Sequence, residues 1–101
     1  MINFTSKQRA YLRSLAHGID PIFQIGKNGF TPEVTTAINE ALETKELIKI
    51  NVLKNCSEEP KEIGPILAER TRSTLIQVMG RKITLYRESE ENKEIEIPRA
   101  K

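Results

Sequence analysis

Two glycines three residues apart join a short apolar run to a helix start, and this junction restricts how the chain can fold. The segment from Ile25 to Glu33 reads Ile-Gly-Lys-Asn-Gly-Phe-Thr-Pro-Glu. Gly26 and Gly29 can adopt positive φ and leave room for a neighbouring backbone. Thr31 is a good N-cap, and the proline after it fits the first helical position. The junction therefore predicts a strand, a tight loop and a helix in direct succession, with free helix N–H groups near the loop.

Hydrophobic spacing elsewhere predicts two more helices and three more strands. We expect helices over residues 6–17, 32–45 and 60–72, and strands over 22–25, 47–53, 74–79 and 83–87. The helix over 32–45 has the clearest apolar stripe, whereas Gly64 and Pro65 both disfavour the interior of the third helix. The order α-β-α-β-α-β-β predicts one mixed β-sheet with helices packed on it, in an α/β (α+β) fold.

The chain is long enough for one domain with a single modest core. Its 101 residues are 38% hydrophobic and 30% charged, a balance typical of a globular protein. From Glu88 onward the sequence becomes rich in Glu, Ser, Asn, Lys and Arg. We therefore expect residues 1–87 to form the domain and residues 88–101 to be a charged, mobile tail.

The formal net charge of +2 conceals a strong segregation of charge along the chain. Residues 70–87 carry five basic side chains and no acidic one, and residues 1–30 carry four basic side chains against one acidic. Residues 31–69 carry eight acidic side chains against four basic ones. This asymmetry predicts an electropositive face for a polyanion and an acidic face turned away from it.

The first helix is expected to carry an apolar side and a basic side. The residues at helical spacing on the apolar side are Phe4, Gln8, Tyr11, Leu12 and Leu15. Arg9, Arg13 and His17 follow one another at i, i+4 and i+8 and form a stripe on another side. Arg9 and Arg13 are candidates for contact with a polyanion, with an ordinary solvated helix face as the alternative. His17 is interpreted as a helix-end residue that favours the C-terminal dipole.

Neither a catalytic site nor a metal site is indicated by the sequence. With one histidine and one cysteine, Cys56, the chain lacks the Cys and His patterns of metal sites. The loop at residues 25–29 does not match the phosphate-binding P-loop pattern. The carboxylates recur at the spacing of solvated helix surfaces, without a sign of a dry pocket. We therefore expect a protein that is not an enzyme and that uses no metal or cofactor.

The cellular setting is also narrowed by what the sequence lacks. A single cysteine excludes an intramolecular disulfide and suits a reducing compartment. No apolar run approaches the length of a membrane span, and no signal peptide is visible at the N-terminus. We expect a cytoplasmic protein that does not associate with membranes, and its small size favours a monomer.

Four stretches in this order resemble a known family of RNA-binding domains. They read Lys-Gln-Arg-Ala-Tyr-Leu-Arg at 7–13, Ile-Gly-Lys-Asn-Gly at 25–29, Glu-Leu-Ile-Lys-Ile at 46–50, and Gly-Arg-Lys-Ile-Thr-Leu-Tyr-Arg at 80–87. Over residues 4–87 the chain resembles the CRM domain (chloroplast RNA splicing and ribosome maturation), in its stand-alone bacterial YhbY-like form. The resemblance implies RNA binding in large ribosomal subunit precursors and a fold similar to the C-terminal domain of bacterial translation initiation factor three. The chain departs from the family pattern at Lys45, where the family commonly has His.

The resemblance also implies that the loop at residues 26–29, the GxxG loop, is presented to RNA as in KH domains. Gly26 and Gly29 would allow close approach of the RNA backbone, with Lys27 against a phosphate and Asn28 against phosphate or sugar. The basic flanks expected to contact RNA are Arg9, Arg13, Arg81 and Lys82. Such contacts set affinity and position and carry little sequence information.

A purely structural interpretation, without RNA contact, remains open for each of these features. The GxxG loop alone is also compatible with a simple strand-to-helix turn, and Arg81, Lys82 and Arg87 with a polar hairpin. Tyr86 is interpreted as a structural residue rather than a platform for stacking a base. In the alternative function, the acidic second and third helices bind a protein partner, and Glu40 and Glu43 matter while Lys27 is dispensable.

Overall fold

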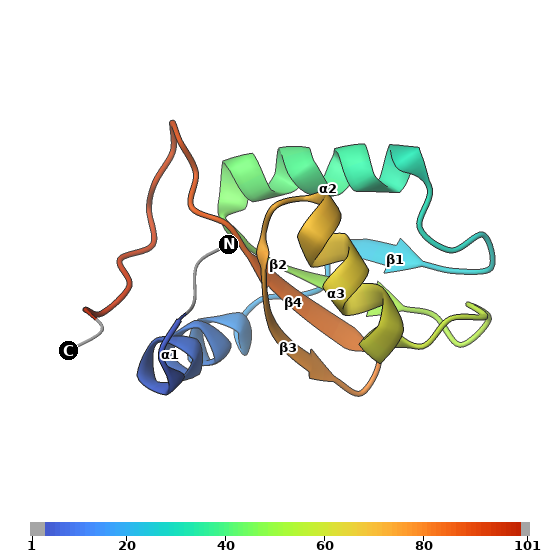
Figure 1. Cartoon of the computed structure of the whole chain (residues 1–101), viewed down its shortest axis with the longest axis horizontal. Helices are drawn as coiled ribbons and strands as arrows, with labels where there is room; N and C mark the ends of the chain where they lie inside the picture. The colour runs from blue at the N-terminus through green and yellow to red at the C-terminus, as the bar shows by residue number, and fades with distance from the viewer. Residues whose placement is uncertain (1–3, 100–101) are drawn as a thin grey trace.

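The computed structural model describes residues 4–99, and it contains three helices and a four-stranded sheet within them (Figure 1). The helices are α1 (Ser6–Ala16), α2 (Pro32–Lys45) and α3 (Pro60–Arg70), and the strands are β1 (Phe23–Ile25), β2 (Leu47–Val52), β3 (Thr74–Met79) and β4 (Lys82–Tyr86). The predicted element order and mixed α/β fold are confirmed. Within the described part of the chain, no helix has the length and apolar character needed to cross a membrane.

The sheet has the strand order β1-β2-β4-β3. β1 pairs in parallel with β2, whereas β4 pairs antiparallel with both β2 and β3. β1 and β2 are parallel because α2 connects them and returns the chain to the end of the sheet at which β1 began. The carboxyl ends of β1 and β2 therefore lie at the same end of the sheet as the hairpin turn between β3 and β4.

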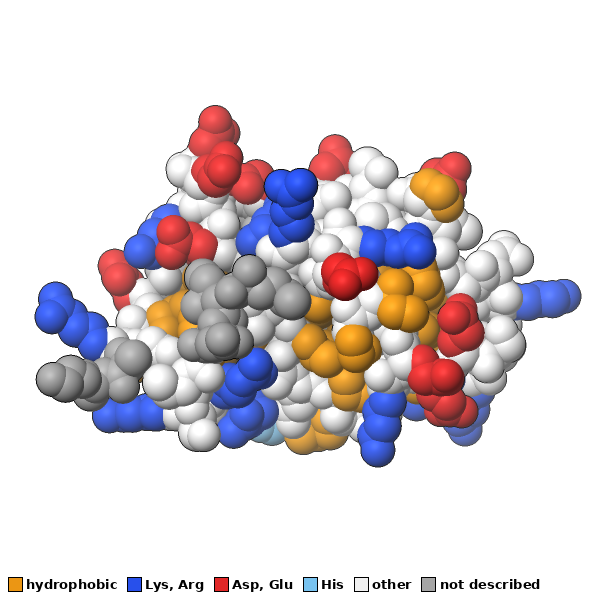
Figure 2. All heavy atoms as spheres, viewed as in Figure 1, with side chains coloured by type: hydrophobic (Ala, Val, Ile, Leu, Met, Phe, Trp, Pro, Cys, Tyr) orange, Lys and Arg blue, Asp and Glu red, His pale blue; other side chains and the backbone are white. Residues whose placement is uncertain are grey.

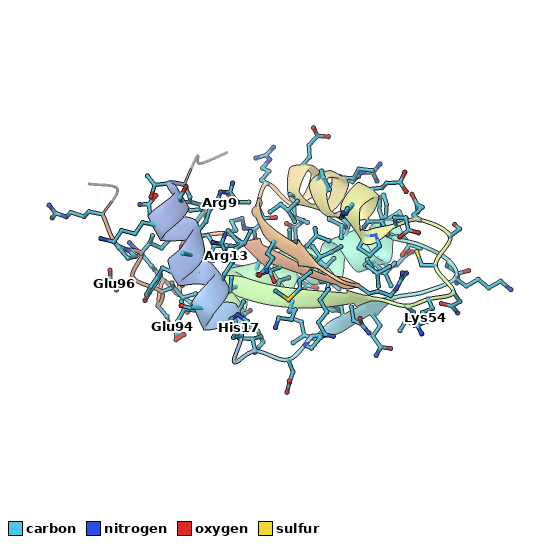
Figure 3. The ribbon with its side chains drawn as sticks, turned by 90° about the horizontal axis from the view of Figure 1, so that it is seen from below. Arg9, Arg13, His17, Lys54, Glu94 and Glu96 are labelled. Atoms are coloured by element: carbon cyan, nitrogen blue, oxygen red, sulfur yellow. The ribbon has the colours of Figure 1, made fainter. Side chains whose placement is uncertain are left out.

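α2 and α3 cover one face of the sheet, whereas α1 lies across one end of the opposite face (Figures 1 and 3). Alternation along the central strands turns one set of side chains towards α2 and α3, as predicted for β2. The fully buried residues of this main core include Ile38, Leu42, Ile48, Ile50, Val52, Ile63, Leu67, Ile83 and Leu85. Cys56 joins them, so its thiol is a buried core group.

Gly64 brings α3 close to the sheet. A Cβ on this residue would lie 3.2 Å from Cδ1 of Leu75 and 3.3 Å from Cγ2 of Val78. The helix continues past Gly64 and Pro65 to Arg70, two residues earlier than the predicted end. It ends there because Arg72 adopts a positive φ of 54°.

A second, smaller core lies under α1, and the sequence predicted its composition only in part. Leu12 and Ala16 pack there with Leu47, Ile76 and Tyr86. The apolar residues around their edge are Phe4, Ile19, Ile95 and Ile97. Leu15, expected to be on the core side, is 36% exposed. The basic stripe was expected on a different side of α1 from the apolar residues. Instead, Arg9 and Arg13 are half-buried on the side of α1 that faces the sheet.

The segment expected to be a mobile tail is held against the domain over residues 88–99. Buried Glu46 accepts hydrogen bonds from the backbone N–H groups of Ser89, Glu94 and Ile95, each 2.8 Å long. The Gln8 amide donates to the carbonyl of Pro98 over 2.8 Å. These contacts give the segment a defined path beside α1, while its mobility in solution and the boundary at residue 87 stay predictions.

Candidate nucleic-acid interface

The GxxG loop forms a tight turn with an exposed tip. The N–H of Gly29 donates to the carbonyl of Gly26 over 2.9 Å, and Gly29 adopts a φ of 66°. Lys27 and Asn28 are both exposed at the tip. A Cβ on Gly26 would lie 3.3 Å from Cδ1 of Leu53, so the loop packs closely on the chain after β2. The turn thus presents Lys27 and Asn28 to solvent on a close-packed base.

The start of α2 behind the loop is capped as the sequence predicted. Oγ1 of Thr31 accepts the N–H of Val34 over 3.2 Å, which satisfies one of the free helix donors. One acidic neighbour was not predicted: a Cβ on Gly29 would lie 3.2 Å from Oε1 of Glu58. Lys27 supplies positive charge at the tip, and Glu58 partly offsets it on the Gly29 side.

Arg81 connects the hairpin turn to the chain beside the GxxG loop. Its Nε donates to the carbonyl of Val52 over 2.7 Å, and its Nη2 donates to the carbonyl of Leu53 over 2.8 Å. The N–H of Leu53 in turn donates to the carbonyl of Ile25. Arg81 thus has a structural role in positioning the loop, and only its remaining N–H donors are free to meet a phosphate.

Lys82 lies in a strand rather than in the hairpin turn where the sequence placed it. The turn consists of Gly80 and Arg81 alone, with a φ of 60° at Gly80, and β4 begins at Lys82 opposite Met79. The two-residue turn is favoured because a positive φ lets the hairpin close with the twist of its strands. The side chain of Lys82 therefore belongs to the sheet surface.

Arg13 and Lys82 line the same hollow between α1 and the sheet. Lys49 and His17 line it too, and neither was included in the site predicted from the sequence. The hollow is lined by Arg13, Ala16, His17, Lys49, Gln77, Met79, Lys82 and Thr84. We call it the sheet hollow. Lys49 was missed, although alternation signals its position: its neighbours Ile48 and Ile50 face the main core, so Lys49 faces the other way.

Two other predicted cations hold the fold together. Nη1 of Arg9 donates to the carbonyl of Leu75 over 2.8 Å and ties α1 to β3. Arg87 donates to Asn39 of α2 and to the carbonyl of Thr71, and it lies 3.9 Å from a carboxylate oxygen of Glu43. Their side chains already have protein partners, unlike the exposed Lys27.

Tyr86 is confirmed as a structural residue. It is 1% exposed and packs edge-on against Phe4, with ring centroids 5.8 Å apart. Burial raises the pKa of Tyr86 to about 12, and the carboxylates of Glu46 and Glu88 add to the effect. The ring is therefore not available for stacking on a base.

Charge is segregated in space as well as along the chain. Figure 2 shows carboxylates along the upper edge, where Figure 1 places α2 and the segment after β4, and Lys and Arg side chains with the histidine along the lower edge below α1 and β3, with further carboxylates at the lower right. The ion pairs among residues 4–99 are Arg87–Glu43 and Lys93–Glu88, and neither of them involves the sheet hollow. The part of the lower edge below α1 and β3 is thus electropositive, as the sequence predicted for one face.

Comparison with known proteins connects this geometry to one family. The sequence model of the CRS1 / YhbY (CRM) domain family matches residues 4–87 of this chain. The solution structure of the hypothetical protein SAV1595 from Staphylococcus aureus superimposes with a TM-score of 0.79 at 55% sequence identity. That match covers 95% of this chain and 100% of the other.

Relatives of known sequence match along nearly their whole length. The probable RNA-binding protein YqeI of Bacillus subtilis is 49% identical over 94 residues, which are 93% of this chain and 98% of the relative. An RNA-binding protein of Haemophilus influenzae is 36% identical over 99 residues, which are 98% of this chain and 99% of the relative.

Proposed function

The chain belongs to the CRS1 / YhbY (CRM) domain family, and from this membership we propose that it is a non-catalytic RNA-binding protein. We propose further that its RNA is ribosomal and that it acts in the cytoplasm, as a monomer, in assembly of the large ribosomal subunit. RNA binding is supported by the names of the relatives from Bacillus subtilis and Haemophilus influenzae. The ribosomal target follows from the family resemblance of the four sequence stretches.

The observation that carries the proposal is the exposed tip of the GxxG loop on a rigid base. Lys27 and Asn28 face solvent, while Gly26 packs against Leu53 and the turn is closed by a backbone hydrogen bond. A loop held in this way loses little conformational freedom on binding. Lys27 would neutralise a phosphate, and Gly29 would let the RNA backbone approach closely.

Sedimentation of cell extract in a sucrose gradient tests the ribosomal assignment. We expect the wild-type protein in fractions that contain large-subunit precursors, and the Lys27→Glu variant at the top of the gradient. The side chain of Lys27 is exposed, so the reversal leaves the fold intact, which circular dichroism of the purified variant checks. In a direct titration with precursor RNA, the reversal should weaken binding about tenfold or more, because a charge-assisted contact contributes about 1.5–3 kcal/mol.

The outcomes separate the proposal from its alternatives. Wild-type protein and variant together at the top of the gradient would contradict the ribosomal assignment. Co-sedimentation of both would retain the assignment and remove the GxxG loop from the interface. Loss of co-sedimentation on Glu40→Lys, with Lys27→Glu unaffected, would favour the protein-interaction alternative on the acidic helices.

A further inference from the structure

α1 covers only one end of its face of the sheet and leaves the rest open (Figure 3). The cross-strand pair under the helix is Leu47 with Tyr86, and both residues are buried in the smaller core. The next pair on this face is Lys49 with Thr84, followed by Asn51 with Lys82. The central strands thus change from apolar to polar as they emerge from under α1, and the sheet hollow begins at this change.

Three Lys and Arg side chains line the sheet hollow without a carboxylate among its lining residues. Lys49 lies on a central strand, where lysine is disfavoured, and Lys82 lies diagonally across from it on β4. Diagonal neighbours are about 7–8 Å apart, within reach of long side chains, so the two ammonium groups repel each other. Arg13 adds a third charge from α1. An anion from outside the described chain would relieve this repulsion.

Neutral groups complete the lining in a way that suits a nucleotide. The β3–β4 ladder shifts register between Leu75 and Gln77, and this bulge turns Ile76 and Gln77 towards the same side of the sheet. Gln77 offers an amide to a base edge, and Met79, 56% exposed, offers a polarizable apolar surface to a base. Bases are accessible to such groups in unpaired strands, since duplex RNA hides their edges.

The hollow is linked to the region of the GxxG loop through Arg81. Lys82 follows Arg81, and Arg81 holds the carbonyls of Val52 and Leu53 beside the loop. Figure 3 shows Arg13 and His17 on α1 at one end of this face, and Lys54 at the other end. A strand that contacts the loop could therefore continue across the sheet towards α1.

We propose that the sheet hollow is a second RNA contact, in which Arg13, Lys49 and Lys82 bind a phosphate of an unpaired RNA strand. The base next to this phosphate packs on Met79. The inference rests on the proposed RNA binding and extends it from the GxxG loop to the open half of the sheet. It assigns Lys49 and Met79 a role that the basic flanks predicted from the sequence do not include.

Fluorescence anisotropy with a labelled ten-nucleotide oligouridylate tests the proposal on the full chain. Lys49→Gln and Lys82→Gln should each weaken binding about fivefold or more, because each removes one charge-assisted contact. Lys61→Gln is the matched control: it removes one exposed lysine from α3, which covers the opposite face of the sheet, and should change binding less than about twofold. Lys49→Gln should leave the thermal midpoint unchanged or raise it, because it relieves repulsion.

Amide NMR with inorganic pyrophosphate tests the phosphate contact separately. The amides of Lys49, Lys82 and Thr84 should shift on titration, and these shifts should diminish in Lys49→Gln. One outcome would contradict the RNA contact in the sheet hollow and leave the proposed function standing. In that outcome, Lys49→Gln and Lys82→Gln bind the oligouridylate as well as Lys61→Gln does, while Lys27→Glu binds it more weakly. If the wild-type protein binds no oligouridylate, the hollow is wrong as an RNA contact, and sedimentation with ribosomal precursors still decides the proposed function.

Discussion

Glu46 shows how one side chain at a helix end determines where a distant segment lies. It caps α2 with a φ of 67°, a strained value for a residue with a side chain, and it is 1% exposed. Burial alone would raise the pKa of Glu46, but the N–H groups of Glu94, Ser89 and Ile95 outweigh burial and hold the pKa below its ordinary value. These hydrogen bonds thus favour the charged form of the carboxylate, and the charged carboxylate in turn holds residues 89–95.

Acid should release the C-terminal segment before the domain unfolds. Because the pKa of Glu46 is lowered in the folded state, its contribution is present above the ordinary value of 4.5 and is lost as the pH falls through the lowered pKa. We expect the amides of Ser89, Glu94 and Ile95 to lose protection from hydrogen exchange in that window. NMR-detected exchange at a series of pH values measures this.

Substitution of the same residue gives an independent check. Glu46→Gln should reduce the protection of these amides at neutral pH and cost about 1–3 kcal/mol of stability, because the NH2 group that replaces one carboxylate oxygen cannot accept a hydrogen bond and leaves a buried N–H donor without its acceptor. Glu40→Gln, at an exposed position in the middle of α2, serves as the control and should change neither quantity. Amides that stay fully protected in Glu46→Gln would show that the second carboxylate oxygen is dispensable for holding the segment.

The arginines mark the limit of sequence reasoning at the residue scale. The sequence identified Arg9 and Arg81 as cations on a basic face, and both are partly buried. It could not predict that they donate to the carbonyls of Leu75 and Val52, because those acceptors are placed by tertiary pairing far along the chain. Alternation along β2 predicts the face of the sheet on which the Lys49 side chain lies. Its proximity to Arg13, however, depends on where α1 crosses the sheet.

Among the elements, α3 depends most on a single small residue. Gly64→Ala would improve helix propensity by about 1 kcal/mol. The added Cβ would meet Leu75 at 3.2 Å and Val78 at 3.3 Å, and overpacking of this kind costs about 1–3 kcal/mol. We expect a net loss of about 1 kcal/mol, measured by urea unfolding. Gly18→Ala, whose Cβ would have only a carbonyl oxygen 4.0 Å away, should change stability by less than about 0.5 kcal/mol.

Element order was predictable because each element has a local signature, whereas their arrangement was not. The N-cap Thr31 and the apolar stripe of α2 predicted that helix from Pro32 to Lys45, as observed. The strand order β1-β2-β4-β3 and the position of α1 depend on contacts between distant segments. For the same reason, the bulge near Ile76 and the docking of residues 88–99 had no signal in periodicity or composition.

At the scale of the whole molecule, the sheet separates two surfaces of opposite charge. Carboxylates gather over α2 along the upper edge of Figure 2, whereas α1 and the open half of the sheet contribute Arg13, Lys49 and Lys82 on the opposite face. Such a distribution orients the molecule towards a polyanion and keeps its acidic side away. Glu43, one member of the acidic surface, is already engaged by Ser89 and Arg87, and the hydrogen bond from Ser89 is the main cause of its lowered pKa.

This separation predicts how RNA affinity depends on salt. If about four phosphates are contacted, the logarithm of the association constant should fall against the logarithm of salt concentration with a slope of roughly −3 to −4. A double variant, Lys27→Gln with Lys82→Gln, should make the slope shallower by roughly 1.5, because two phosphate contacts are removed. Glu40→Gln should leave the slope unchanged, because its carboxylate lies on α2, behind the sheet, and screening acts over about 10 Å at 0.1 M salt. Anisotropy titrations at four salt concentrations measure these slopes, and a slope that responds to Glu40 but not to the two lysines would place RNA on the acidic side and contradict the interface.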